Sequence, residues 1–380
     1  MAPCGPFEPQ TGPSVCMSVD NSRHRAMSRP SNFAGQDGSI LFLDGLRGTA
    51  RFRSTSAALG RSLPWMFSIW DLMCRTSMSS LYKFVNRESL LRILGGSIRF
   101  TQPSAFNDPF ELLAEIVMPM GGRKIPPESK INVRVDLLAK RRNPPVGELD
   151  SIPDDCLSFD PTFRDIVAML NREIGFFCLS MNSDSLLMWS HYADQYAGAV
   201  VEFDATHDFF ANSIEIEYRA LRPKKHVRIL HADEPIPLSE LCIKSIQWEY
   251  EKEVRIVRRL CECESAGCAD PRGFPIFTQK VPLDAIKSVI FGDRMPHEAM
   301  GKIYERLKDT KIALHLAAID MTGFRFRRET IKYPVPLSQM GPCLTPRTAN
   351  IFSDLPTPLG DLARTILQSH PMSKIVNKPV

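Results

Sequence analysis

The sequence lacks the short motifs by which common enzyme classes are recognised. Its 380 residues contain no G-x-G-x-x-G, no G-x-x-x-x-G-K-[ST], no G-x-S-x-G and no H-E-x-x-H. These motifs mark dinucleotide loops, phosphate loops, hydrolase nucleophiles and zinc proteases. Without them, any chemistry must come from residues that only the fold brings together.

Long apolar runs and a cysteine framework are lacking too. The segment LPWMFSIWDLMC at Leu63–Cys74 includes Asp71 and is shorter than the roughly 20 apolar residues of a membrane span. Ten cysteines are scattered without a repeating pattern, and no cleavable leader pattern precedes them. We therefore expect reduced thiols, a cytoplasmic protein and no membrane partner. The CECESAGC stretch has three thiols but no second C-x-x-C pair or nearby histidine, so we predict no metal site there.

Charge of one sign is not in excess. The 47 basic and 43 acidic residues give a net charge of +4, which is too small and too dispersed to indicate a nucleic-acid binder. The basic stretch RPKKHVR at 222–228 is either a solvated loop or a contact for phosphate. A hydrophobic content of 43% supports a substantial core.

Three regions differ in composition. Residues 1–77 mix Pro, Ser, Gly and Arg without a period of 2 or 3.6, so we expect a disordered leader, or an extension upstream of a true start at Met78. Residues 78–335 read as a single α+β domain. Prolines return near Pro336, and we expect residues 336–380 to be a loosely ordered tail.

The domain's patterning predicts more strands than helices. We expect strands near 81–84, 97–101, 174–180, 199–203, 214–218, 248–258, 276–281, 285–292 and 313–318, and helices near 87–94, 186–192, 238–246 and 296–308. Because helices and strands do not alternate regularly, we predict an α+β fold with a mixed, mostly antiparallel sheet and flanking helices.

Two polar stretches are candidate binding elements. In PSAFNDPFE, Ser104 and Asn107 could contact a ligand, although Asn and Asp beside Pro109 also suit a purely structural turn. In LLMWSHYADQYAGAVVEF, the side chains of Trp189, His191 and Tyr192 fall within one turn. They could hold a flat heterocycle or a ribose, or simply belong to the core.

The stretch WEYEKEVRIV carries the most chemistry. If it is one strand, Glu249, Glu251 and Glu253 share a face with Arg255, about 7 Å apart along the strand. Carboxylates so placed repel unless a cation or ligand lies among them, which indicates a site. The alternative is a solvated face paired with Lys244 or with bases on a neighbouring strand.

These blocks, together with LYKF, SIRFT and IKSVIFGDRM, resemble the family catalogued as domain of unknown function 2971 over roughly residues 81–295. That family has no settled activity. A fainter similarity is to the ADP-ribosyltransferases, including DNA-modifying toxins, in which a first strand with a polar residue is followed by a helix, a small-residue strand and a late Glu-x-Glu. Tyr82-Lys83, GGSIRF and Glu251-Lys252-Glu253 occur here in that order.

The second resemblance implies an ADP-ribosyltransferase-like fold and an NAD-consuming transferase or glycohydrolase, acting as a toxin or antiphage effector. In that reaction Glu253 stabilises an oxocarbenium-like state and Glu251 orients the acceptor. Tyr82, Ser104, Asn107, Trp189, His191, Tyr192 and Arg255 form the cofactor-binding set. The co-substrate is a nucleotide, NAD, and the acceptor is an unspecified protein or nucleic acid.

Two other functions stay open. One is a metal-dependent nuclease in which Asp108, Glu111, Glu251 and Glu253 hold Mg²⁺, since hard cations favour carboxylates. The other is a non-enzymatic module whose aromatic and acidic surface recognises a ligand or partner protein.

Overall fold

A computed structural model describes residues 79–120, 134–159, 161–231 and 235–378. The predictions of a disordered leader over residues 1–77 and of a start at Met78 concern residues outside these ranges. Within the described part, no helix is both long and apolar enough to cross a membrane.

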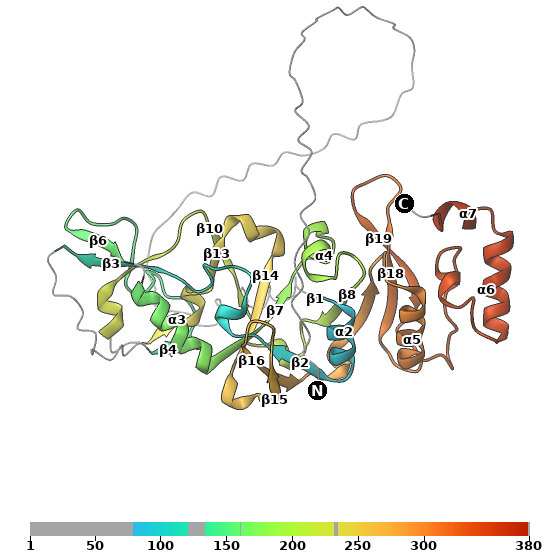
Figure 1. The fold of residues 1–380 in the computed structure, drawn as a ribbon, viewed down its shortest axis with the longest axis horizontal. Helices are drawn as coiled ribbons and strands as arrows, with labels where there is room; N and C mark the ends of the chain where they lie inside the picture. Colours follow the sequence, from blue (N-terminus) through green and yellow to red (C-terminus); the bar gives the residue numbers. More distant parts are fainter. Residues whose placement is uncertain (1–78, 121–133, 160, 232–234, 379–380) are drawn as a thin grey trace, which may run out of the picture. The chain divides into compact units, whose positions relative to one another are not determined.

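The described residues form six α-helices and nineteen strands (Figure 1). The helices are α2 (Arg87–Leu94), α3 (Pro161–Glu173), α4 (Leu186–Tyr192), α5 (His297–Leu307), α6 (Pro358–Ser369) and α7 (Ser373–Val376). The strands are β1 (Ser80–Val85), β2 (Ser97–Phe100), β3 (Glu115–Pro119), β4 (Val135–Asp136), β5 (Glu148–Leu149), β6 (Cys156–Phe159), β7 (Ile174–Ser180), β8 (Ala199–Asp204), β9 (Ile214–Glu215), β10 (Glu217–Arg219), β11 (Lys224–His226), β12 (Ile236–Pro237), β13 (Ile243–Ser245), β14 (Glu253–Arg259), β15 (Glu264–Ala269), β16 (Pro275–Lys280), β17 (Ile286–Phe291), β18 (Ala313–Ile319) and β19 (Phe326–Lys332).

An eight-stranded sheet organises the fold, in the order β19-β18-β17-β8-β1-β7-β14-β9. Its neighbouring strands are antiparallel except β17 and β18, which are parallel and are joined through α5. Smaller sheets, β15-β16-β2 and β5-β11-β3-β6 among them, pack beside it. The predicted α+β class with a mixed, mostly antiparallel sheet is therefore confirmed.

Helix α2 shows how local sequence fixes an element. The Asn86 side chain accepts a hydrogen bond from the Ser89 N–H, and the backbone N–H of Gly95 closes the last turn. Leu90, Ile93 and Leu94 recur at helical spacing and are buried in the main core. The predicted and observed ranges of this helix agree.

Both faces of the large sheet are covered. On one face, strand residues such as Val201, Phe203 and Val289 pack with α2 and α5 into the main core. On the other, Trp189 of α4 packs with Phe84 and with residues of β8, β17 and β18. A separate cluster gathers around α3 and includes Phe176 of β7.

The sheet forks between β1 and β7. These strands share a single register pair, Tyr82 with Ser180, whereas β7 pairs with β14 over seven residues. At the other end of β7, Thr101 exchanges both backbone hydrogen bonds with Phe176, at 2.8 Å each. The chain that follows β2 therefore occupies the place that β1 leaves, and a gap opens between the strands.

Two predicted elements differ from the structure. The expected strand at 248–258 is a 3-10 helix, η5 (Ile246–Glu251), followed by β14, because Ser245 caps η5 and Lys252 turns the chain with a φ of 42°. The expected helix at 238–246 is the short turn η4 (Leu238–Glu240) followed by β13, which pairs with β10. In each case capping and tertiary strand pairing outweigh the local pattern.

The C-terminal region also differs from the loosely ordered tail that we expected. Helix α6 begins at a Thr357 cap and buries Ala363 in the main core. The Phe352 ring packs edge-on against Tyr304 of α5 at 4.9 Å. Prolines in this segment mark turns and a helix start rather than disorder, since proline suits the first helical turn.

Candidate functional site

A cavity of about 240 Å³ opens at the fork between β1 and β7. Its walls come from β1, β7, the segment after β2, α4, β13 and the η5–β14 junction. The lining residues are Tyr82, Lys83, Phe84, Thr101, Ala105, Phe106, Asn107, Cys178, Leu179, Met188, Tyr192, Lys244, Glu251 and Glu253. The fork thus brings early, middle and late parts of the chain into one enclosure.

Glu251 and Glu253 reach the cavity from the two sides of Lys252. The two residues do not belong to one continuous strand, in which alternation would place them on the same face. Instead, Glu251 is the last residue of η5 and Glu253 is the first residue of β14. The left-handed backbone of Lys252 makes the turn, and its carbonyl accepts a hydrogen bond from the Met181 N–H. Both carboxylates are buried, at 3% and 6% exposure.

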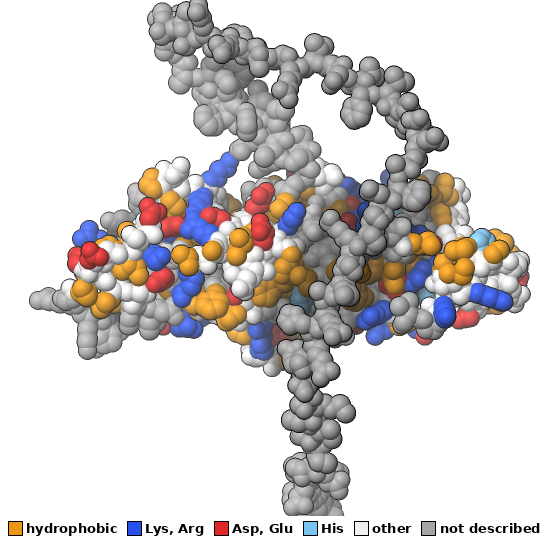
Figure 2. Space-filling view, turned by 90° about the horizontal axis from the view of Figure 1, so that it is seen from above, with side chains coloured by type: hydrophobic (Ala, Val, Ile, Leu, Met, Phe, Trp, Pro, Cys, Tyr) orange, Lys and Arg blue, Asp and Glu red, His pale blue; other side chains and the backbone are white. Residues whose placement is uncertain are grey.

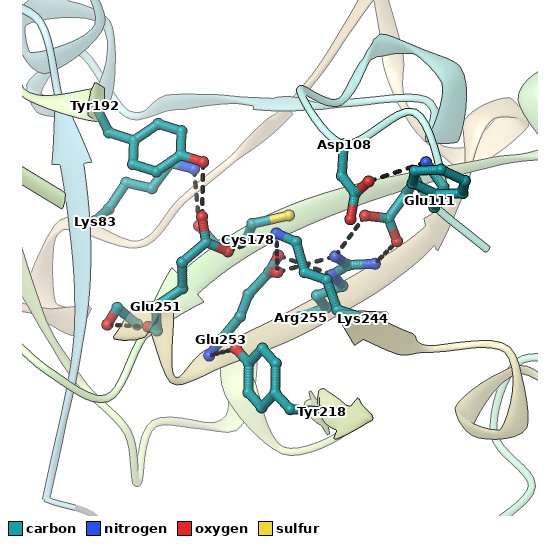
Figure 3. A network of polar contacts seen from close by, with 12 residues as sticks. Lys83, Asp108, Glu111, Cys178, Tyr192, Tyr218, Lys244, Glu251, Glu253 and Arg255 are labelled. Carbon is teal, nitrogen blue, oxygen red and sulfur yellow. Dashed lines mark hydrogen bonds and ion pairs between the residues drawn. The ribbon is translucent and has the colours of Figure 1, made fainter. Parts of the chain in front are cut away.

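Lys244 bridges these two carboxylates (Figure 3). Its ammonium donates to Glu251 Oε2 and to Glu253 Oε2, the latter at 3.2 Å, and lies 4.8 Å from the centre of the Trp248 ring. The sequence had offered ion pairing with Lys244 as the alternative to a ligand site, and this pairing is present. It is buried, however, and not part of a solvated face.

Arg255 forms the inner end of the network. Its guanidinium donates to both oxygens of Glu253, at 2.8 and 2.9 Å, and to both oxygens of Glu111 (Figure 3). The rings of Phe106 and Phe176 lie 4.9 and 5.5 Å from its centre. Bidentate pairing with the two carboxylates and stacking against the two rings hold this buried guanidinium in place. Arg255 therefore supports Glu253 from the side away from the cavity.

Tyr192 closes the outer end. Its hydroxyl donates a 2.7 Å hydrogen bond to Glu251 Oε1, and the Asn107 side chain also interacts with that hydroxyl. The polar chain therefore runs without a break from Asn107 through Tyr192, Glu251 and Lys244 to Glu253.

Burial and charge oppose each other at the carboxylates. Burial alone would raise the pKa of Glu253, but the charge and hydrogen bonds of Arg255, with the charge of Lys244, hold that pKa well below its usual range. Burial raises the pKa of Glu111 despite Arg255. The two carboxylates share one guanidinium, and Glu253 also has Lys244, so Glu253 is the carboxylate held in the ionised form.

The Tyr192 hydroxyl and the Cys178 thiol have raised pKa values and stay protonated near neutral pH. Burial and the neighbouring Glu251 raise the pKa of Tyr192 far above its usual value. Burial and Glu253 likewise raise the pKa of the Cys178 thiol. A thiol with so little thiolate is a poor nucleophile, which leaves the carboxylates as the reactive groups of the enclosure.

The structure brings five of the nine predicted site residues together. Tyr82, Asn107, Tyr192, Glu251 and Glu253 all line the cavity. Tyr82 lies on the same face as Glu253, because each is the register partner of Ser180.

The other four lie elsewhere. Ser104 is exposed and exchanges hydrogen bonds with Asn171, and Trp189 is a core residue whose indole N–H donates to the Ser183 carbonyl. His191 is exposed, with its ring 6.4 Å from that of Tyr250. Arg255 is fully buried and saturated by carboxylates. The ligand contacts that we predicted for these residues do not fit their positions, because sequence proximity does not show which way a side chain points.

Sequence reasoning missed the two lysines at the cavity. Lys83 follows Tyr82 on β1 and lines the cavity as well. Its ammonium crosses the gap between β1 and β7 and donates a 2.7 Å hydrogen bond to the Cys178 carbonyl. Lys244 was considered only as a surface partner. The charged residue in the apolar run LCIKSI was the one available signal for a buried lysine, because lysine is rarely buried without a partner.

The magnesium hypothesis does not fit this geometry. Lys244 bridges Glu251 and Glu253, and Arg255 bridges Glu253 and Glu111, so ammonium and guanidinium groups already neutralise these carboxylates. Over the described residues, no group of three His, Cys, Asp or Glu side chains could hold a metal ion. All the cysteines in these ranges are free thiols, with Cys261 and Cys268 exposed.

Comparison with known proteins gives no relative. No protein-family model, no curated protein and no solved structure matches this chain. The resemblances to domain of unknown function 2971 and to the ADP-ribosyltransferases therefore stay predictions from the sequence.

Proposed function

We propose that this domain cleaves the bond between nicotinamide and ribose in NAD, as a glycohydrolase or an ADP-ribosyltransferase. One observation supports the proposal above all others. Two buried carboxylates, Glu251 and Glu253, line a cavity at a fork in the sheet and face it together with Tyr82, Asn107 and Tyr192. Enclosed carboxylates beside aromatic and amide groups suit a sugar bonded to a flat ring.

The size of the cavity limits what it can enclose. At about 240 Å³ it lies below the roughly 300–1,000 Å³ of typical small-molecule sites. It suits one ring with part of its ribose, so the rest of a dinucleotide must extend outward. Tyr82, Phe106 and Tyr192 supply aromatic surface for the ring, and Lys83 supplies a cation at the fork.

The chemistry follows from the charge of the carboxylates. As the glycosidic bond breaks, nicotinamide leaves with the bonding electron pair and positive charge develops on the ribose. A carboxylate kept ionised at a buried position stabilises that charge, and Glu253 is so held by Arg255 and Lys244. Glu251 accepts the proton of the water or acceptor that attacks the sugar carbon.

A second candidate has its own support. Both carboxylates are already bridged by Lys244, and Glu253 is also bound by Arg255. A binding module needs such a pre-arranged polar floor but no free base. Recognition of a nucleotide without cleavage is therefore the alternative function. On the face in Figure 2, basic and acidic side chains of the described residues intermingle without a continuous basic surface, which favours a small ligand over a nucleic acid.

The test uses the full chain with NAD labelled in the nicotinamide and the adenosine. We expect the native protein to release nicotinamide, and Glu253→Gln to lower the rate on the order of 10²-fold or more. Glu249→Gln is the matched control, because Glu249 lies on η5 but is exposed. Loss of rate in both variants equally would contradict a specific role for Glu253.

Binding separates the two candidates. At NAD concentrations about 100 times the dissociation constant, a ligand of the folded state adds about 2.7 kcal/mol of stability, which a thermal shift detects. Stabilisation without nicotinamide release supports the binding module. Neither stabilisation nor release, in protein shown to be folded, overturns both. A role as a toxin or antiphage effector stays a prediction from the resemblance.

A further inference from the structure

Among the described residues, Lys244 alone forms ion pairs with both cavity carboxylates, and it does so through a single atom. Its Nζ donates to Glu251 Oε2 and to Glu253 Oε2, and its side chain is only 8% exposed. The Trp248 ring covers the ammonium at 4.8 Å. The stem comes from β13, which is held in parallel register with β10, so the position of the ammonium is fixed by the sheet.

Lys244 is one of two cations in ion pairs with a cluster of three carboxylates. Glu111, Glu251 and Glu253 are three carboxylates, and the only cations in ion pairs with them, among the described residues, are Arg255 and Lys244. Arg255 serves Glu111 and Glu253. Glu251 has Lys244 as its cation and the Tyr192 hydroxyl as its other side-chain donor. Two like charges that are buried side by side repel, and a cation between them offsets that repulsion.

Several packed elements present groups to this pair. Carboxylates and cations come from η5, β14, β13 and the Glu111 turn, and Lys83 of β1 lines the same cavity but donates to the Cys178 carbonyl. Tyr192 faces the pair from α4, Tyr218 from β10 and Cys178 from β7. Burial raises the pKa of Tyr218 to about 12, and burial also raises the pKa values of Tyr192 and Cys178.

We infer that Lys244 is a positioning residue that holds Glu251 and Glu253 side by side at the floor of the cavity and keeps Glu253 ionised. Its importance for catalysis rests on the proposed function, because an ionised Glu253 beside Glu251 is what the bond cleavage uses. Its effect on the charge of Glu253 does not depend on that function.

The test is a titration of the full chain with ¹³C-labelled glutamate side chains, followed by NMR without any ligand. In Lys244→Met we expect Glu253 to protonate about 1–3 pH units higher than in the native protein, because it loses one of its two cations. Lys244→Arg keeps a cation and should titrate like the native protein. Lys302→Met is the control, because Lys302 pairs with Glu298 at an exposed position of α5. A titration of Lys244→Met that superimposes on the native curve overturns the inference.

A double variant guards against loss of folding. Lys244→Met with Glu251→Gln removes one cation and one carboxylate, so the charge balance returns. We expect this protein to fold and its Glu253 to remain ionised as in the native chain. If it unfolds as readily as Lys244→Met alone, Lys244 serves packing only and the inference fails. Since no substrate is used, absence of NAD cleavage leaves this result intact.

Discussion

Tyr82 and Glu253 lie on the same face of the large sheet, two strands apart, because each is the register partner of Ser180 on β7. Ser180 is also where β1 and β7 last pair before the fork. Its hydroxyl donates to the Glu251 carbonyl at 2.6 Å, which ties the η5–β14 junction to the same row. The cavity therefore opens beside the single register pair that joins β1 to β7.

The Tyr192–Glu251 hydrogen bond should contribute to stability. Tyr192→Phe removes the hydroxyl and leaves the buried Glu251 carboxylate with one donor fewer. We therefore expect the free energy of unfolding, measured in urea, to fall by about 1.5–3 kcal/mol. Tyr333→Phe is the control, since Tyr333 is 47% exposed. Equal urea midpoints for the two variants would show that the hydrogen bond adds nothing.

Removing Arg255 should be costly because two buried carboxylates lose their shared cation. We expect Arg255→Met to lower the free energy of unfolding by about 3–5 kcal/mol, measured by urea denaturation. Adding Glu111→Gln and Glu253→Gln to this variant should recover part of the loss. A triple variant no more stable than Arg255→Met would assign the cost to lost packing against Phe106 and Phe176 instead. The exposed pair of Arg92 with Glu88 offers a contrast, and Arg92→Met should have little effect.

The backbone of Lys252 should tolerate glycine but not a β-branched residue. At a φ of 42°, a residue with a Cβ is strained by roughly 1–2 kcal/mol, and glycine is not. We expect Lys252→Gly to keep the fold with equal or slightly higher thermal stability, and Lys252→Val to lower it. Crystal structures or amide hydrogen exchange at the η5–β14 junction would show whether the carboxylates move. Identical melting temperatures for the two variants would argue against strain here.

Stability should fall on acidification, and Glu253 should account for part of the fall. Its pKa is lower in the folded chain than its usual 4.5, so the folded state binds fewer protons than the unfolded state. The stabilisation is present above about pH 4.5 and is lost as the pH falls through the folded pKa. The pKa values of Glu202, Glu148 and Asp270 are lowered too, and act in the same direction.

Urea unfolding as a function of pH checks this. Compared with the native protein, Glu253→Gln should show a shallower decline below about pH 4.5, because one group no longer takes up a proton on unfolding. Glu111 works in the opposite sense and in a different pH range. Burial raises its pKa above 4.5, so its contribution is fully present below about pH 4.5 and is lost as the pH rises through the folded pKa, and Glu111→Gln should remove this loss above about pH 4.5. Parallel curves for all three proteins would contradict the assigned directions.

The sequence by itself determined much of the fold. Helices α2, α4 and α5 could be predicted because each buries apolar residues at helical spacing, and strands β7 and β8 because each is a short, almost continuous apolar run that is buried on both faces. The α+β class followed from the same patterns. The importance of Glu251 and Glu253 was also predicted, from carboxylates too close together to be left unpaired.

Only the tertiary structure decided how the site is built. It replaced a predicted strand with η5, Lys252 and β14, because a cap and a left-handed residue are not visible in hydrophobic spacing. It buried Trp189 and Arg255 and brought Lys83 and Lys244 to the cavity. The fork between β1 and β7 forms because the distant residue Thr101, and not β1, pairs with Phe176 of β7. Sequence spacing fixes the face on which a side chain lies, but only long-range pairing fixes what lies opposite it.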